Sequence, residues 1–144
     1  MERFSEPTQG VLDLLTQVRS ERFNHLEDIS IKVIMDNKPR VSKVDGKVTF
    51  AYIKVVNEVE DFLISDDQYE YLLFLITTPW DLASTEDKVR IISHELRHIF
   101  IDERGKCRII KHEIQDFYDE VELNSDDPRW GERLALSVKS ALDV

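Results

Sequence analysis

The spacing of apolar residues changes near residue 29, and this change separates a predicted helix from a predicted strand. Between residues 8 and 25 apolar side chains recur every three or four positions, as on one face of an amphipathic helix, and Pro7 stands near its start. From 29 to 36 the apolar positions alternate with others. This alternation predicts a strand.

The middle of the chain reads as strands joined by turns. Asp45-Gly46 lies between residues 41–44 and 47–50, which is a strong hairpin signal, and the second arm continues to residue 56. A short helix is expected over 57–63. Residues 69–77 are rich in aromatic and aliphatic side chains and predict another strand. This strand is also a candidate edge to which an extended peptide could add.

Helical spacing returns in the second half. Apolar residues recur at helical intervals over 85–102, after Ser84 or Thr85 as the capping residue. Further helices are expected over 113–123 and 128–142. A helix, several strands and then mostly helices predict an α+β fold with a small, mainly antiparallel sheet. Without repeats or linkers, we expect residues 1–144 to form one domain.

Composition and charge narrow the class of protein. The chain of 144 residues is 42% hydrophobic and 33% charged, which is typical of a soluble globular protein. No apolar run approaches the roughly 20 residues of a membrane span, no secretory leader is visible, and Cys107 is the single cysteine. We therefore expect a cytoplasmic protein with no membrane partner. The net charge of −10 argues against a nucleic-acid partner.

The candidate chemistry lies in residues 94–98, which read HELRH. His94 and His98 are four positions apart, so on a helix both imidazoles face the same side and can bind one metal ion at about 2.0–2.1 Å. Glu95 is offset by about 100° and can reach a water molecule on the open side of the ion, as a general base does. Arg97 must face solvent or pair with a carboxylate, because unpaired burial is costly.

A catalytic zinc ion normally has three protein ligands, so a third is needed. His112 is the best candidate, since Gly105 lets the chain reverse and thirteen residues separate His98 from His112. Asp116 lies four residues later and could accept a hydrogen bond from the ring nitrogen that does not bind metal, or be an exposed helix carboxylate. The rival ligands are the oxygens of Glu113, Asp116 and Glu120 and the sulfur of Cys107.

HELRH followed by KHEIQDF at residues 111–117 resembles the putative phage metallopeptidase family, which is similar in its motif to the zincin superfamily. The resemblance covers most of the chain. It implies a compact zincin-like domain in which the sheet packs on the motif helix. It also implies that His94, His98 and His112 bind Zn²⁺ and that Glu95 is the catalytic base. A phage or prophage origin and a peptide or protein substrate follow from the same likeness.

The hypothesis is thus a zinc-dependent metallopeptidase. The alternative is a non-catalytic metal-binding or protein-interaction module that retains the motif. A deformylase-like amidase is disfavoured, because its extra cysteine ligand would lie upstream of the motif and Cys107 lies downstream.

Overall fold

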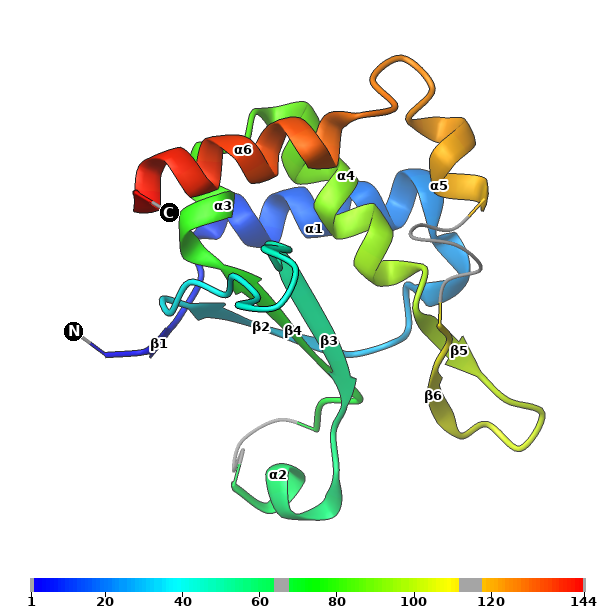
Figure 1. The fold of residues 1–144 in the computed structure, drawn as a ribbon. Helices are drawn as coiled ribbons and strands as arrows, with labels where there is room; N and C mark the ends of the chain where they lie inside the picture. Colours follow the sequence, from blue (N-terminus) through cyan, green and yellow to red (C-terminus); the bar gives the residue numbers. More distant parts are fainter. Residues whose placement is uncertain (1, 64–67, 112–117, 144) are drawn as a thin grey trace.

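The structure is a computed structural model that describes residues 2–63, 68–111 and 118–143. It has the α+β architecture expected from the sequence, and within the described residues no helix is long and apolar enough to cross a membrane (Figure 1). In chain order the elements are β1 (Phe4–Ser5), α1 (Gln9–Arg22), a 3-10 turn (Asn24–Leu26), β2 (Ile31–Asp36), β3 (Ala51–Val55), α2 (Glu58–Leu63), β4 (Tyr71–Ile76), α3 (Thr77–Leu82), α4 (Thr85–Leu96), β5 (Ile99–Ile101), β6 (Cys107–Ile109), α5 (Tyr118–Leu123) and α6 (Trp130–Leu142).

The main sheet has the strand order β1-β2-β4-β3. Two of its pairings are antiparallel, whereas β2 and β4 run parallel with Ile31 opposite Tyr71. Every residue of β4 is buried, which suits its unbroken apolar sequence and its place between two strands. The strand predicted over 69–77 is therefore confirmed, but the suggestion that it offers an edge is wrong. The edges are β1 and β3.

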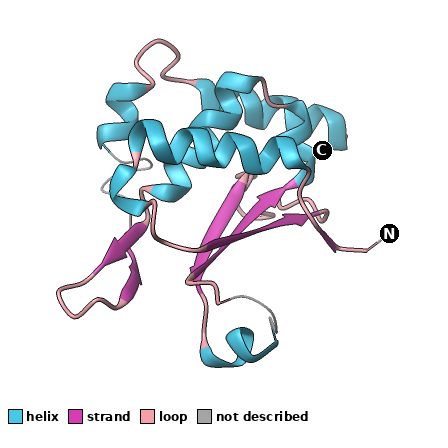
Figure 2. Cartoon of the chain, turned by 180° about the vertical axis from the view of Figure 1, so that it is seen from behind, coloured by secondary structure: helices cyan, strands magenta, loops and turns pink. Residues whose placement is uncertain are grey.

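Helices α1, α4 and α6 lie together on one side of this sheet (Figures 1 and 2). Val18 of α1, Ile92 and Leu96 of α4, and Leu73 and Leu75 of β4 are almost fully buried in the shared core. The predicted packing of the sheet on the motif helix is thus observed, and it fixes α4 beside β3.

The predicted hairpin around Asp45-Gly46 forms only near its turn, and its longer arms are wrong. The Ser42 N–H donates to the Lys47 carbonyl at 2.9 Å, Val41 and Val48 form an isolated bridge, and β3 begins only at Ala51. The reason is local hydrogen bonding: the Asp45 carboxylate accepts from the Lys47 N–H, and the Gly46 N–H donates to a backbone carbonyl within the same loop. Such bonds compete with a strand ladder.

The helix predicted over 85–102 ends at Leu96. Residues 99–101 instead form β5, which pairs with β6 in a separate hairpin, and Gly105 occupies its turn at a positive φ of 77°. The buried Tyr71 hydroxyl lies 2.9 Å from the Arg108 carbonyl and accepts from the Arg108 N–H at 3.1 Å. β4 thereby anchors the hairpin, a tertiary contact that overrides helical periodicity. Two further elements, β1 and α3, were not predicted.

Candidate metal centre

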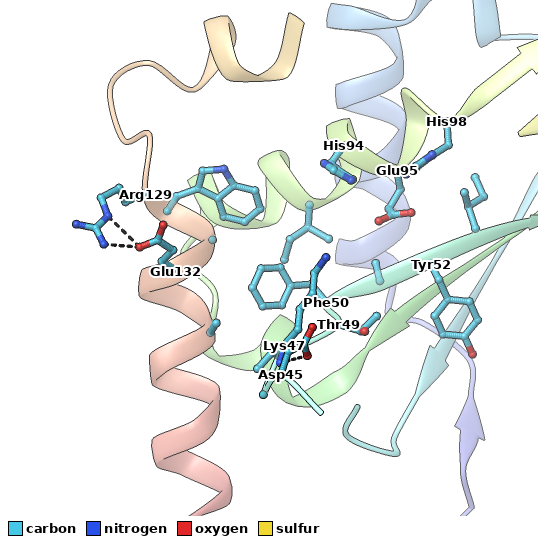
Figure 3. A pocket seen from close by; sticks show the side chains of 18 of the residues that line it. Asp45, Lys47, Thr49, Phe50, Tyr52, His94, Glu95, His98, Arg129 and Glu132 are labelled. Carbon is cyan, nitrogen blue, oxygen red and sulfur yellow. Dashed lines mark hydrogen bonds and ion pairs between the residues drawn. The ribbon is translucent and has the colours of Figure 1, made fainter. Parts of the chain in front are cut away.

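Helix α4 starts where the sequence predicts and presents the motif at its other end. The Ser84 side chain accepts from the Asp87 N–H at 3.2 Å and so caps the helix. Because Ile92 and Leu96 hold one face of the helix in the core, His94 and Glu95 are directed into a pocket beside β3 (Figure 3).

Three side chains of the motif gather at this pocket. One ligand atom from each of His94, Glu95 and His98 lies within 4.8 Å of the other two. The two imidazole centroids are 5.3 Å apart, and Glu95 is buried, with 7% of its surface exposed. His98 follows the helix rather than belonging to it, but its N–H donates to the Glu95 carbonyl at 3.1 Å and continues the helical turn. His94 and His98 therefore face the same side, as predicted, although the helix ends before His98.

The ring of His98 is oriented by the backbone that follows β6. Its Nδ1 lies 2.5 Å from the Ile110 carbonyl, and the Ile110 N–H donates back to the His98 carbonyl at 2.7 Å. A carbonyl can only accept, so Nδ1 carries the proton and the lone pair of the neutral ring is on Nε2. A metal-binding histidine is commonly held in this way, with one ring nitrogen hydrogen-bonded and the lone pair of the other directed at the ion.

The family model for putative phage metallopeptidases matches residues 4–140, which includes the motif and nearly all of the fold. The chain belongs to this family. Comparison with curated proteins and with solved structures gave no match. The resemblance stated from the sequence is therefore confirmed at the level of the family.

Two of the rival ligands point elsewhere. Glu120 is fully buried and accepts from Arg97 Nε at 2.7 Å. Arg97 thus pairs with a carboxylate, as expected, and its guanidinium also lies 4.7 Å from the Phe23 ring centroid. Cys107 donates to Glu70 at 3.3 Å, and burial, with the Glu70 carboxylate next to it, raises the pKa of the thiol. A raised pKa disfavours the thiolate that a metal binds.

The other candidates, His112, Glu113 and Asp116, lie outside the described residues, and their predicted roles stay predictions.

The motif opens into a cleft of about 800 Å³. Ala51, Tyr52 and Ile53 of β3 form one wall, and the start of α6, with Trp130, forms another. Hydrogen bonds from Ile76 N–H to the Phe50 carbonyl and from Val56 N–H to the Glu70 carbonyl fix the phase of the antiparallel ladder. Even-numbered residues of β3 therefore bond to β4. Ala51, Ile53 and Val55 direct their backbone groups to the outer edge of β3, which no strand among the described residues covers.

The sequence did not predict two parts of the cleft. Trp130 is buried in the core and also lines the cleft, with its ring 5.9 Å from that of Phe50. The free edge of β3 was not predicted either, since the order of strands depends on pairings between distant segments. The hydrogen bond from His98 to the Ile110 carbonyl had no sequence signal, because any residue supplies a carbonyl.

Proposed function

We propose that this protein is a zinc-dependent peptidase in which His94, His98 and His112 hold the ion and Glu95 is the general base. The observation that carries the proposal is the cluster of two imidazoles and one carboxylate within 4.8 Å, at a cleft with an open strand edge. Family membership supports the same activity.

The donor set fits zinc. Two nitrogens bound to one tetrahedral ion at 2.0–2.1 Å are about 3.4 Å apart, a separation that the observed cluster allows with small side-chain rotations. Imidazole nitrogen is a preferred zinc ligand, and the tautomer of His98 places the lone pair of the ring on Nε2. Zinc, when bound in such a site, polarises a carbonyl and lowers the pKa of a water molecule.

Glu95 supplies the proton transfer in this proposal. Its carboxylate is largely shielded from solvent and shares the cleft with both histidines. We expect it to accept a proton from the attacking water and to return it to the leaving amine. Glu95 is followed by Leu96, whose side chain is 1% exposed, so the core limits the movement of the motif.

The edge of β3 suits a peptide as substrate. An extended peptide added to this edge would bond to the backbone groups of Ala51, Ile53 and Val55, as in β-augmentation. Their side chains pack toward the helices, so the ladder is firmly placed beside α4. Main-chain pairing of this kind binds many sequences and holds the scissile bond at a fixed distance from the motif.

The test is cleavage of a random-sequence peptide library by zinc-loaded protein, with products identified by mass spectrometry. We expect new termini with the wild-type protein and a loss of rate of about 10²-fold or more with Glu95→Gln, because general-base catalysis contributes that much. The variant should keep its zinc content, since the amide replaces a group that is not a ligand in this proposal.

Glu70→Gln is a matched control, because it makes the same change at a carboxylate that hydrogen-bonds Cys107 outside the cleft. It should leave the rate near that of the wild type. Full activity in Glu95→Gln would contradict the mechanism. Zinc binding without any cleavage by the wild-type protein would favour the non-catalytic metal-binding module instead.

A further inference from the structure

Two lysine side chains line the part of the cleft that the proposed chemistry does not use. Lys47 comes from the loop before β3 and Lys139 from the last turns of α6. Figure 3 shows Lys47 and Asp45 in the same pocket as His94 and Glu95 but set apart from them. A Cβ on Gly46 would lie 3.2 Å from the Lys139 ammonium nitrogen, so the two elements meet closely at this point.

Neither lysine forms an ion pair with a carboxylate among the described residues, although Asp45 lies close enough to Lys47 for their charges to attract each other. The other cation at this cleft, Arg129, forms an ion pair with Glu132. Asp45 also lines the cleft, and its carboxylate accepts the backbone N–H of Lys47 at 3.0 Å. Lys47 is exposed and Lys139 is half-buried. Two cations beside one carboxylate are notable in a chain with a net charge of −10, because the half-buried ammonium of Lys139 would be stabilised by a nearby anion.

The distance from the motif follows from the way the loop and helix run. Phe50 packs on Trp130, whereas Gly46 meets Lys139. Four residues of extended chain and nine residues of helix each span about 13 Å, so the loop and α6 run side by side between these contacts. An extended peptide covers about 13 Å in four residues. Phe50 and the motif line the same cleft, and the lysines lie about one such step from Phe50.

We propose that Lys47 and Lys139 form a carboxylate-binding subsite. It selects peptides with an acidic side chain or a free C-terminal carboxylate several residues from the scissile bond, on one side. The inference rests on the proposed peptidase function for its substrate class. A peptide is favoured over a nucleic acid because the lysines share their cleft with an open strand edge.

The test is capture of peptides by immobilised, zinc-loaded Glu95→Gln protein, so that binding is measured without turnover. The probe is a random dodecapeptide library, half with a free C-terminal carboxylate and half amidated, read by mass spectrometry. We expect Asp and Glu at one position, or the free carboxylate, to be enriched about three- to tenfold, the effect of one or two partly exposed ion pairs. Comparison with the amidated half shows whether an acidic side chain or the free C-terminal carboxylate is bound.

Charge reversal provides the decisive comparison. Lys47→Glu with Lys139→Glu should abolish the enrichment, and the milder Lys47→Met and Lys139→Met should each reduce it. Lys43→Glu is the matched control, because Lys43 is exposed in the same loop but does not line the cleft. It should have no effect.

Several outcomes would overturn the subsite: no acidic enrichment, enrichment of basic peptides as the net charge alone predicts, or an equal effect of Lys43→Glu. Displacement of bound peptides by a DNA oligonucleotide but not by a glutamate-rich peptide would assign the lysines to nucleic acid and also overturn it. Failure of the subsite can be distinguished from failure of the proposed peptidase function. Acid-selective capture without cleavage by the wild-type protein leaves the subsite standing and contradicts the peptidase, whereas cleavage without acidic preference does the reverse.

Discussion

Replacing Arg97 with Met tests how the end of the motif is tied to α5. Arg97 Nε donates to Glu120 at 2.7 Å, and Glu120 is fully buried, whereas the Arg97 side chain is 23% exposed. The substitution leaves a buried carboxylate without its partner, and breaking a buried pair in this way costs about 3–5 kcal/mol. The partial exposure of Arg97 places the expected loss at about 3 kcal/mol, the lower end of that range.

The same estimate can be stated as a melting temperature. An unfolding entropy of about 2.1 cal/mol/K per residue gives about 0.3 kcal/mol/K for a chain of this length, so 3 kcal/mol lowers Tm by about 10 °C. Methionine keeps an apolar stem that can pack on Phe23, so the loss reports mainly on the charge. Urea unfolding, followed by circular dichroism, measures the free energy of unfolding directly.

Three further variants make the reasoning refutable. Glu120→Gln should cost less than Arg97→Met, because Arg97 can turn to solvent and to Asp119. The double variant Arg97→Met/Glu120→Leu should be more stable than Arg97→Met, since it removes the buried charge. Arg129→Met breaks an exposed pair and should change stability by less than about 0.5 kcal/mol. The argument would be refuted if Arg97→Met were as stable as the wild type. It would also be refuted if the double variant were no more stable than Arg97→Met.

Two further predictions concern α4 and β3. Burial raises the pKa of Asp87, but hydrogen bonds from Arg133 and Arg90 outweigh this effect and hold the pKa below its usual value. The charged carboxylate therefore stabilises the folded state above about pH 4, and this contribution is lost as the pH falls further. Asp87→Asn should therefore be less stable than the wild type in urea at pH 7 and nearly equal at pH 2; an equal difference at both would contradict this. Ile53→Pro removes an N–H from the edge of the sheet and should weaken capture of peptides. It also loses apolar packing, but it should lower Tm less than Tyr52→Pro, which removes a ladder N–H; the reverse order would contradict the ladder phase.

Local signals in the sequence predicted most of the elements. The cap at Ser84 and the spacing of Ile92 and Leu96 locate α4, and the continuous apolar run of β4 marks a buried strand. These features depend on neighbours within a few residues, so a single sequence reveals them. The family resemblance at HELRH added the class of chemistry.

What the sequence did not reveal depends on contacts between distant segments. β4 lies inside the sheet because β2 pairs with it in parallel, and no local pattern encodes that choice. The helix stops at Leu96 because Tyr71 anchors the β5–β6 hairpin, 37 positions away at Arg108. Lys139 had no signal as a cleft residue, since a lysine on the half-exposed face of a helix is ordinary until the fold sets a loop against it.

The zinc content of the purified protein, measured by inductively coupled plasma mass spectrometry, tests the central claim most directly. We predict about one zinc per chain in the wild-type protein and a large loss in His94→Ala, His98→Ala and His112→Ala, because a catalytic site has three protein ligands. His25→Ala is the matched control, since His25 is exposed and lies outside the cleft, and it should keep the full content. Equal zinc in the wild type and in His94→Ala and His98→Ala would contradict the metal centre.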